Sequence, residues 1–150
     1  MLHYSNHCNG IGVDLSEKAL AVSEKNAEKL GITAKWLHSD LFEAVEGKFD
    51  IIVSNPPYIE SAVIETLMPE VKEHEPRMAL DGTEDGLFFY EKIIREAGNY
   101  LNRNGMLFFE IGYNQAEVVK CFMESGGFTE VVVKKDYAGL DRVVYGTYLG

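Results

Sequence analysis

The chain carries the run FDIIVSNPPY at residues 49–58, an apolar segment that stops at two consecutive prolines. Ile and Val bounded by turn-forming residues indicate a buried strand. Because proline lacks a backbone N–H and has a fixed φ, Pro56 and Pro57 must end the hydrogen-bond ladder of that strand. The run therefore predicts a rigid platform at the carboxyl end of a strand, with the Asn55 side chain at its lip. In open α/β sheets, ligands bind at this edge.

This platform is rich in hydrogen-bond acceptors. Asn55 has a side-chain carbonyl oxygen, and the neighbouring backbone carbonyls add more, while Pro56 and Pro57 contribute no competing N–H donors. Two acceptors at a fixed spacing match the two hydrogens of a planar –NH2 group, and Tyr58 offers a flat face for packing against that group. Such a site orients the nitrogen lone pair toward an electrophile by positioning and electrostatics, without an acid–base residue.

Length and composition indicate one soluble domain. The chain has 150 residues, of which 46% are hydrophobic and 25% charged, and this suffices for a single sizeable core. No apolar run approaches the roughly 18 residues of a membrane span, and no secretory signal is visible at the N-terminus. The formal net charge of −10 argues against tight binding of duplex DNA, which depends on Lys and Arg.

Candidate metal ligands are few. Cys8 and Cys121 have no metal-ligand spacing and give no disulfide framework, which favours a reducing, cytoplasmic setting. His3 and His7 would share one face of a helix, a spacing that fits a metal site. A ragged helix end or tail is the simpler interpretation of this segment, and we predict no metal.

Strands and helices alternate ahead of the two prolines. We expect strands at residues 10–14, 34–38 and 49–54, and a helix over residues 17–30. Ser16 is the expected N-cap of the helix and Gly31 its stop. This order is typical of a parallel sheet in an α/β fold.

Three polar side chains follow the three strands in turn: Asp14, Asp40 and Asn55. Parallel strands would gather them at one edge of the sheet. An acid there can accept hydrogen bonds from both hydroxyls of a ribose, and a second acid can accept one from an adenine amino group. The alternatives are that Asp14 interacts with the dipole of the following helix and that Asp40 is a turn residue. The ordered pair favours the functional interpretation.

The second half of the chain continues the alternation. Pro69 and Pro76 interrupt residues 59–75, which predicts a long loop with a short helix near residues 62–68. Further on we expect a helix from Asp85 to about residue 102, a strand at 106–111, a helix at 114–125, and antiparallel strands at 128–134 and 142–149.

Taken together, these segments resemble a known family. The string at residues 49–59 is similar to the amino-group methyltransferases that use S-adenosylmethionine, and most of all to the protein-glutamine N5-methyltransferases of the HemK/PrmC group. That group modifies the glutamine of the Gly-Gly-Gln loop in peptide-chain release factors. Other segments agree with the resemblance, at residues 12–14, 39–40, 75–80, 105–112 and 136–143.

The resemblance implies an α/β fold, namely the Rossmann-like sheet of class I S-adenosylmethionine-dependent methyltransferases with a C-terminal antiparallel strand pair. It assigns catalysis to Asn55, Pro56, Pro57 and Tyr58, substrate binding to Asn55, Pro56, Tyr58 and Glu75, and cofactor binding to Asp14, Leu15, Asp40, Leu41 and Asn55. The cofactor is S-adenosylmethionine, and Leu41 would lie against its adenine face. For Glu75 a solvated charge cluster is an equal alternative.

One part of the family pattern is missing. The first strand of the family ends in a glycine-rich loop roughly 20 residues before the ribose acid, by analogy with the dinucleotide fold. We therefore expect residues 1–150 to form a single, N-terminally truncated methyltransferase domain without that strand. The gap would lie between the strands that end at Asp14 and Asn55, and it would expose ladder edges. Either residues 1–9 or a second copy of the chain, in a homodimer, is expected to cover them.

Three functional hypotheses follow. In the first, the chain transfers a methyl group from S-adenosylmethionine to the side-chain amide nitrogen of glutamine in a release factor. In the second, it is an amino-group methyltransferase of DNA or RNA, which the acidity of the chain disfavours. In the third, it is a non-catalytic remnant of the fold, in which the Pro-Pro turn is only rigid. We expect no membrane and no direct nucleic-acid partner.

Overall fold

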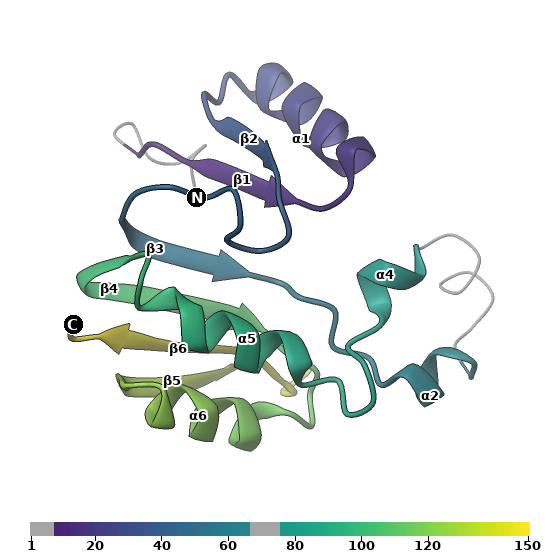
Figure 1. Cartoon of the computed structure of the whole chain (residues 1–150). Coiled ribbons are helices and arrows are strands. Elements are labelled where there is room, and N and C mark those ends of the chain that lie inside the picture. The colour runs from purple at the N-terminus through teal and green to yellow at the C-terminus, as the bar shows by residue number, and fades with distance from the viewer. Residues whose placement is uncertain (1–7, 67–75) are drawn as a thin grey trace. The chain divides into compact units, whose positions relative to one another are not determined.

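The computed structural model describes residues 8–66 and 76–150, and the chain divides into two compact units, residues 1–47 and residues 48–150. Each unit has its own sheet. The first holds two strands in the order β1-β2, and the second holds four in the order β3-β4-β6-β5 (Figure 1). Within the described residues no ladder joins β1 to β3, which is the place where the family pattern predicts a missing strand.

The first unit is a strand–helix–strand motif. Strands β1 (Ile11–Asp14) and β2 (Lys35–His38) pair in parallel, joined by helix α1 (Glu17–Leu30). Ser16 caps the helix, since its hydroxyl oxygen accepts a hydrogen bond from the Ala19 N–H at 3.3 Å. Gly31 ends the helix at a φ of 66°, a left-handed conformation that costs glycine little. The predicted cap, helix and stop are confirmed.

The second unit contains the remaining elements. In chain order they are β3 (Phe49–Ser54), α2 (Ser61–Ile64), α4 (Arg77–Leu80), α5 (Phe88–Ala97), β4 (Leu101–Glu110), α6 (Ala116–Ser125), β5 (Phe128–Lys135) and β6 (Asp141–Tyr148). Strand β3 runs parallel to β4, whereas β6 is antiparallel to both β4 and β5. The predicted C-terminal antiparallel pair is thereby confirmed.

The core of this unit lies between one face of the sheet and the helices α5 and α6, which cover that face (Figure 1). Side chains along β4 alternate, so that Leu107 and Phe109 are fully buried while Phe108 between them is only half-buried. Tyr90 of α5 meets Phe109 edge to face, with ring centroids 5.2 Å apart. This packing stabilises the end of the sheet at which the carboxyl ends of β3 and β4 lie.

The helix predicted from Asp85 to about residue 102 is shorter at both ends. Asp85 accepts a hydrogen bond from the Leu87 N–H at 3.0 Å, but the helix begins only at Phe88. At the other end, Leu101 opens strand β4 opposite Phe49, although its spacing fits the apolar stripe of the helix. Pairing with β3 in the sheet overrides the helical period there. The Phe49 N–H donates to the Tyr100 carbonyl at 2.8 Å, and the Leu101 carbonyl accepts from the Lys48 Nζ at 3.2 Å.

The segment after the prolines is held by a backbone bridge. The Ile59 N–H donates to the Leu80 carbonyl at 3.0 Å, and the Gly82 N–H donates to the Ile59 carbonyl at 2.8 Å. The predicted helix at residues 62–68 is a single turn, α2, and its last two predicted residues lie outside the described range. Among the described residues, no helix has both the length and the apolar character that a membrane crossing requires.

Candidate active site

The motif Asn55–Tyr58 follows directly on β3, at the carboxyl end of the strand, as the prolines predict. Asn55 is exposed, Pro56 is buried, and Pro57 and Tyr58 are half-buried. The Asn55 side-chain amide therefore lies at the surface, and the three residues that follow it are buried or half-buried. Its neighbour β4 ends at the same edge, because the two strands are parallel.

A glycine-containing loop packs directly against the back of the motif. A Cβ atom at Gly82 would lie 2.8 Å from the Tyr58 Cα and 2.9 Å from the Pro57 carbonyl oxygen. At Gly86, which has a φ of 70°, a Cβ atom would collide with the Tyr58 carbonyl oxygen. Both positions are buried, so backbone touches backbone and no side chain fits between.

Gln115 ties this loop and the motif together from beneath. Its side chain is 7% exposed, and it lies just before α6. The amide Nε2 donates to the carbonyl oxygens of Tyr58 at 3.0 Å and Gly86 at 3.2 Å. The amide Oε1 accepts from the Gly112 N–H at 3.0 Å. Sequence analysis missed this residue, because a glutamine ahead of a helix carries no signal of a long-range partner.

Tyr90 completes the buried polar cluster. Its hydroxyl lies 3.0 Å from the Glu110 carbonyl oxygen, to which it donates, and 3.3 Å from the Gln115 Oε1. Burial raises the pKa of Tyr90 far above its ordinary value, and the nearby Tyr58 and Glu110 raise it further. The phenol is therefore neutral near pH 7 and remains a hydrogen-bond donor.

Four of the five residues assigned to the cofactor lie in the first unit, where β1 and β2 end at one edge, and the fifth, Asn55, lies in the second unit. Asp14 stands opposite His38 in the ladder, and Asp40 follows two residues later. The Asp14 Oδ1 accepts a hydrogen bond from the Ser16 N–H at 2.7 Å, so the carboxylate also contacts the backbone at the start of α1. This contact fits the alternative interpretation, in which Asp14 interacts with the helix that follows it. Exposed Leu15 continues the same turn.

A buried serine shapes the second turn of this edge. The Ser39 Oγ accepts from the Ala44 N–H at 2.8 Å and donates to the Leu41 carbonyl at 3.1 Å. Leu41 itself has a φ of 50°, an uncommon conformation for a leucine. Carboxylates beside exposed apolar side chains are a chemically suitable set for the hydroxyl donors and flat base of a nucleoside. The residues of the first unit thus fit S-adenosylmethionine.

The structure brings the predicted site residues together in two groups, one in each unit. The first group holds Asp14, Leu15, Asp40 and Leu41, and the second holds Asn55, Pro56, Pro57 and Tyr58. Glu75 lies outside the described residues. Its neighbour Arg77 pairs with Glu65 at 3.1 Å and with Asp81 at 3.4 Å.

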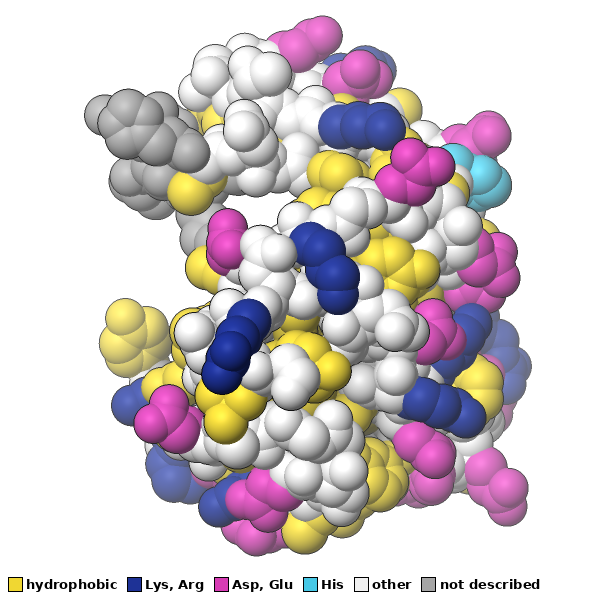
Figure 2. All heavy atoms as spheres, turned by 60° about the vertical axis from the view of Figure 1, so that its left-hand side comes forward, with side chains coloured by type: hydrophobic (Ala, Val, Ile, Leu, Met, Phe, Trp, Pro, Cys, Tyr) yellow, Lys and Arg dark blue, Asp and Glu magenta, His cyan; other side chains and the backbone are white. Residues whose placement is uncertain are grey.

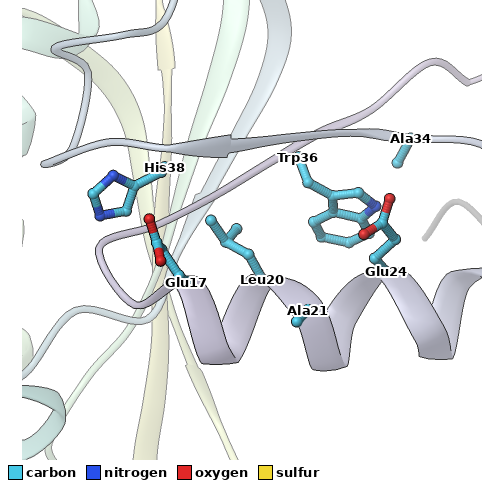
Figure 3. Close-up of a pocket in the computed structure, with 7 residues that line it drawn as sticks. All are labelled: Glu17, Leu20, Ala21, Glu24, Ala34, Trp36 and His38. Carbon is cyan, nitrogen blue, oxygen red and sulfur yellow. The ribbon is translucent and has the colours of Figure 1, made fainter.

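A hollow of about 430 Å³ lies elsewhere in the first unit, between α1 and β2 (Figure 3). It is lined by Glu17, Leu20, Ala21, Glu24, Ala34, Trp36 and His38. The Trp36 ring occupies the space where a side chain at position 12 would stand, which explains the glycine there. None of the predicted cofactor residues lines this hollow.

Comparison with known proteins shows that the chain is similar to methyltransferases. A family model described as the methyltransferase small domain matches residues 1–74. A release factor glutamine methyltransferase of Geobacter sulfurreducens is 45% identical over 141 residues, which are 93% of this chain and 50% of that protein. One of Clostridium botulinum is 53% identical over 113 residues, 73% of this chain and 40% of that protein. The chain is similar to release factor glutamine methyltransferases over most of its length. It spans about half the length of the curated relatives it matches.

Solved structures agree with this similarity. A release-factor-specific protein-(glutamine-N5) methyltransferase of Alicyclobacillus acidocaldarius superposes with a TM-score of 0.51 at 25% identity, covering 95% of this chain and 80% of that one. A methyltransferase of Pyrococcus furiosus gives a TM-score of 0.69 at 20% identity, covering 95% and 64%. A T. thermophilus rRNA methyltransferase in complex with AdoMet and guanosine gives 0.60 at 20%, covering 92% and 31%. The predicted Rossmann-like class I fold is confirmed. The T. thermophilus neighbour is a complex with AdoMet, the cofactor that the sequence resemblance implies for this chain.

Proposed function

We propose that this chain carries the amide-binding and cofactor-binding residues of an enzyme that methylates the side-chain amide nitrogen of glutamine in a release factor. The observation that carries the proposal is the platform Asn55–Tyr58, an exposed amide acceptor followed by buried Pro56 and half-buried Pro57 at the carboxyl end of β3. Similarity to release factor glutamine methyltransferases supports the same substrate class.

The chemical problem is that an amide nitrogen is a poor nucleophile, because its lone pair is delocalised into the carbonyl. The Asn55 Oδ1 and the Pro56 carbonyl oxygen would each accept one N–H of the substrate amide, which orients the nitrogen and favours localisation of its lone pair. Tyr58 would pack against the amide plane. S-adenosylmethionine, when bound, supplies an electrophilic methyl group on a sulfonium. The acceptor nitrogen gains the methyl group and gives up one of its two N–H protons to solvent, so the transfer depends on positioning more than on an acid–base residue.

The cofactor residues have separable roles in this proposal. Asp14 would accept hydrogen bonds from the ribose hydroxyls through its exposed carboxylate, and Asp40 would accept one from the adenine amino group. Leu15 and Leu41 would supply apolar surface beside them, with Asn55 completing the set.

The partner is proposed to be the Gly-Gly-Gln loop of a release factor. In the described part of the face shown in Figure 2, Lys and Arg side chains are interspersed with Asp and Glu, and no continuous basic patch forms. With the net charge of −10, this supports a protein substrate over DNA or RNA. Substrate contact by Glu75, a homodimer and a cytoplasmic location stay predictions.

A methyl-transfer assay tests the proposal. The purified chain is incubated with S-adenosylmethionine carrying a labelled methyl group and with release factor, DNA or RNA. Label should appear in the release factor and should vanish when the Gln of its Gly-Gly-Gln loop is replaced. Label in nucleic acid would favour the second hypothesis. A folded chain that binds no cofactor and transfers no label would favour the non-catalytic remnant.

A further inference from the structure

Gln115 is the buried side chain that reaches the motif from beneath. Its amide connects the motif at Tyr58, the glycine loop at Gly86 and the turn after β4 at Gly112. We propose that Gln115 is a positioning residue for the transfer, because its amide fixes the Tyr58 carbonyl and, through it, the orientation of the platform. The proposal rests on the proposed function and adds a residue to its machinery.

The prolines explain why the platform needs an anchor at this point. Pro56 and Pro57 have no N–H, so the backbone across them offers no donor with which the fold could hold it. On one side β3 holds the motif, since Ser54 pairs opposite Phe109 in the ladder. On the other side the hold comes from the Tyr58 carbonyl bound to Gln115 and from the Ile59 N–H bound to the Leu80 carbonyl.

The chemistry requires an amide at position 115. Its NH2 group faces two carbonyl oxygens, and its oxygen faces the Gly112 N–H, so the side chain has one favourable orientation. Carboxylate offers no donor for either carbonyl, and an apolar side chain leaves both unsatisfied in a buried place.

The test compares Gln115→Met, which keeps the length and removes every hydrogen bond, with Tyr90→Phe as the matched control. Tyr90→Phe removes the hydroxyl from the same cluster but leaves both Nε2 donors in place. With release factor as substrate, we expect Gln115→Met to lower kcat/KM by about 10- to 100-fold, mainly in kcat, because a misplaced amide is bound but reacts slowly. We expect Tyr90→Phe to change kcat/KM by less than about threefold, even where it lowers the thermal stability as much as Gln115→Met does.

A second variant gives a signature that mere loss of stability would not. In Gln115→Glu, burial raises the pKa of the introduced carboxyl group, and its protonated form has one O–H to donate to the Tyr58 carbonyl. The activity of this variant relative to the unsubstituted chain should therefore rise as the pH is lowered from 8 toward 6. A ratio that stays constant with pH, or kinetics of Tyr90→Phe that match those of Gln115→Met, would overturn the proposal.

Hydrogen exchange keeps the inference testable if the chain transfers no methyl group. In the unsubstituted chain the Ile59 N–H should be protected, and Gln115→Met should speed its exchange by at least about tenfold while Tyr90→Phe leaves it within threefold. The Asn55 side-chain amide signals in an NMR spectrum should shift in the first variant only. Unchanged exchange and unchanged Asn55 signals in folded Gln115→Met would overturn the positioning role, whereas an inactive unsubstituted chain would overturn only the proposed function.

Discussion

At the scale of single residues, the site is an arrangement of acceptors. Asn55 supplies an exposed side-chain oxygen, and the two prolines after it supply carbonyl oxygens without N–H groups. The Gln115 side chain supplies N–H donors, and these bind the Tyr58 and Gly86 carbonyl oxygens on the buried side of the motif. In the proposed function, a substrate –NH2 group would be held by both of its hydrogens on two of these acceptor oxygens.

The first prediction concerns the acceptor at position 55. Asn55→Leu removes the side-chain oxygen while keeping the branched shape of the side chain, and it should lower kcat/KM for the release factor by about 10²- to 10³-fold. Asn55→Asp keeps an acceptor in the same place and should retain at least about ten times more activity than Asn55→Leu. Steady-state kinetics measure both, and thermal melts check that both fold. Equal loss in the two variants would show that the acceptor is not what matters.

The second prediction concerns Gly86. A left-handed φ costs an L-residue about 1–2 kcal/mol, and forced contact adds about 1–3 kcal/mol. Gly139 also has a positive φ, 81°, but a Cβ atom there has no neighbour within 4 Å. Gly86→Ala should therefore lower the free energy of unfolding by about 1–3 kcal/mol more than Gly139→Ala does. Urea unfolding of both variants measures the difference, and equal losses would mean that the Tyr58 carbonyl moves aside freely.

At the scale of elements, the Asp136 carboxylate stabilises the loop that connects β5 and β6. In the β5–β6 hairpin, Asp136 accepts hydrogen bonds from the Ala138 N–H at 2.9 Å and the Leu140 N–H at 3.0 Å, and pairs with Arg142 at 3.3 Å. Arg142 in turn donates to the Ile111 carbonyl at 3.1 Å, so the hairpin and the end of β4 are joined.

The third prediction is the pH dependence of this hairpin. The Leu140 N–H, with the Ala138 N–H and Arg142, holds the pKa of Asp136 below its usual value. A lowered pKa in the folded state means that the stabilisation is present above the unfolded value of about 3.9 and is lost as the pH falls through the folded pKa. The melting temperature of D136N should lie below that of the unsubstituted chain at pH 7, and the gap should shrink below about pH 4. A gap that persists at pH 2 would exclude ionisation of Asp136 as its cause.

At the scale of the whole molecule, the two carboxylates proposed for the cofactor and the motif proposed for the amide fall in different units. The carboxylates assigned to the nucleoside lie in residues 1–47, and the motif assigned to the amide lies in residues 48–150. Cofactor binding and amide positioning should therefore respond to different substitutions.

The fourth prediction uses this division. Asp14→Ala should weaken S-adenosylmethionine binding at least tenfold, as calorimetric titration measures, because the ribose hydroxyls lose a charged acceptor. Glu24→Ala, which removes a carboxylate from the middle of α1 in the same unit, should leave the affinity within about threefold. The Ile59 N–H should keep its protection in both variants. If Asp14→Ala and Glu24→Ala bound S-adenosylmethionine with equal affinity, the ribose would not be bound at Asp14.

Local chemistry by itself determined a large part of this protein. Ser16, Gly31, Pro56 and Pro57 each start or stop an element through their own backbone or side-chain properties, so their effects are written in the sequence. The order of Asp14, Asp40 and Asn55 after successive strands likewise follows from the period of the apolar residues. These signals reach only a few residues along the chain.

The tertiary structure decided what depends on partners far away. Leu101 fits a helix by its spacing but is a strand residue because Phe49 pairs with it across the sheet. Gln115 reads as a polar residue ahead of a helix, yet it binds the carbonyl of Tyr58, which lies 57 positions earlier. Long-range pairing and burial select these roles, and neither leaves a local pattern, because the energy comes from satisfying backbone groups that only the folded chain brings together.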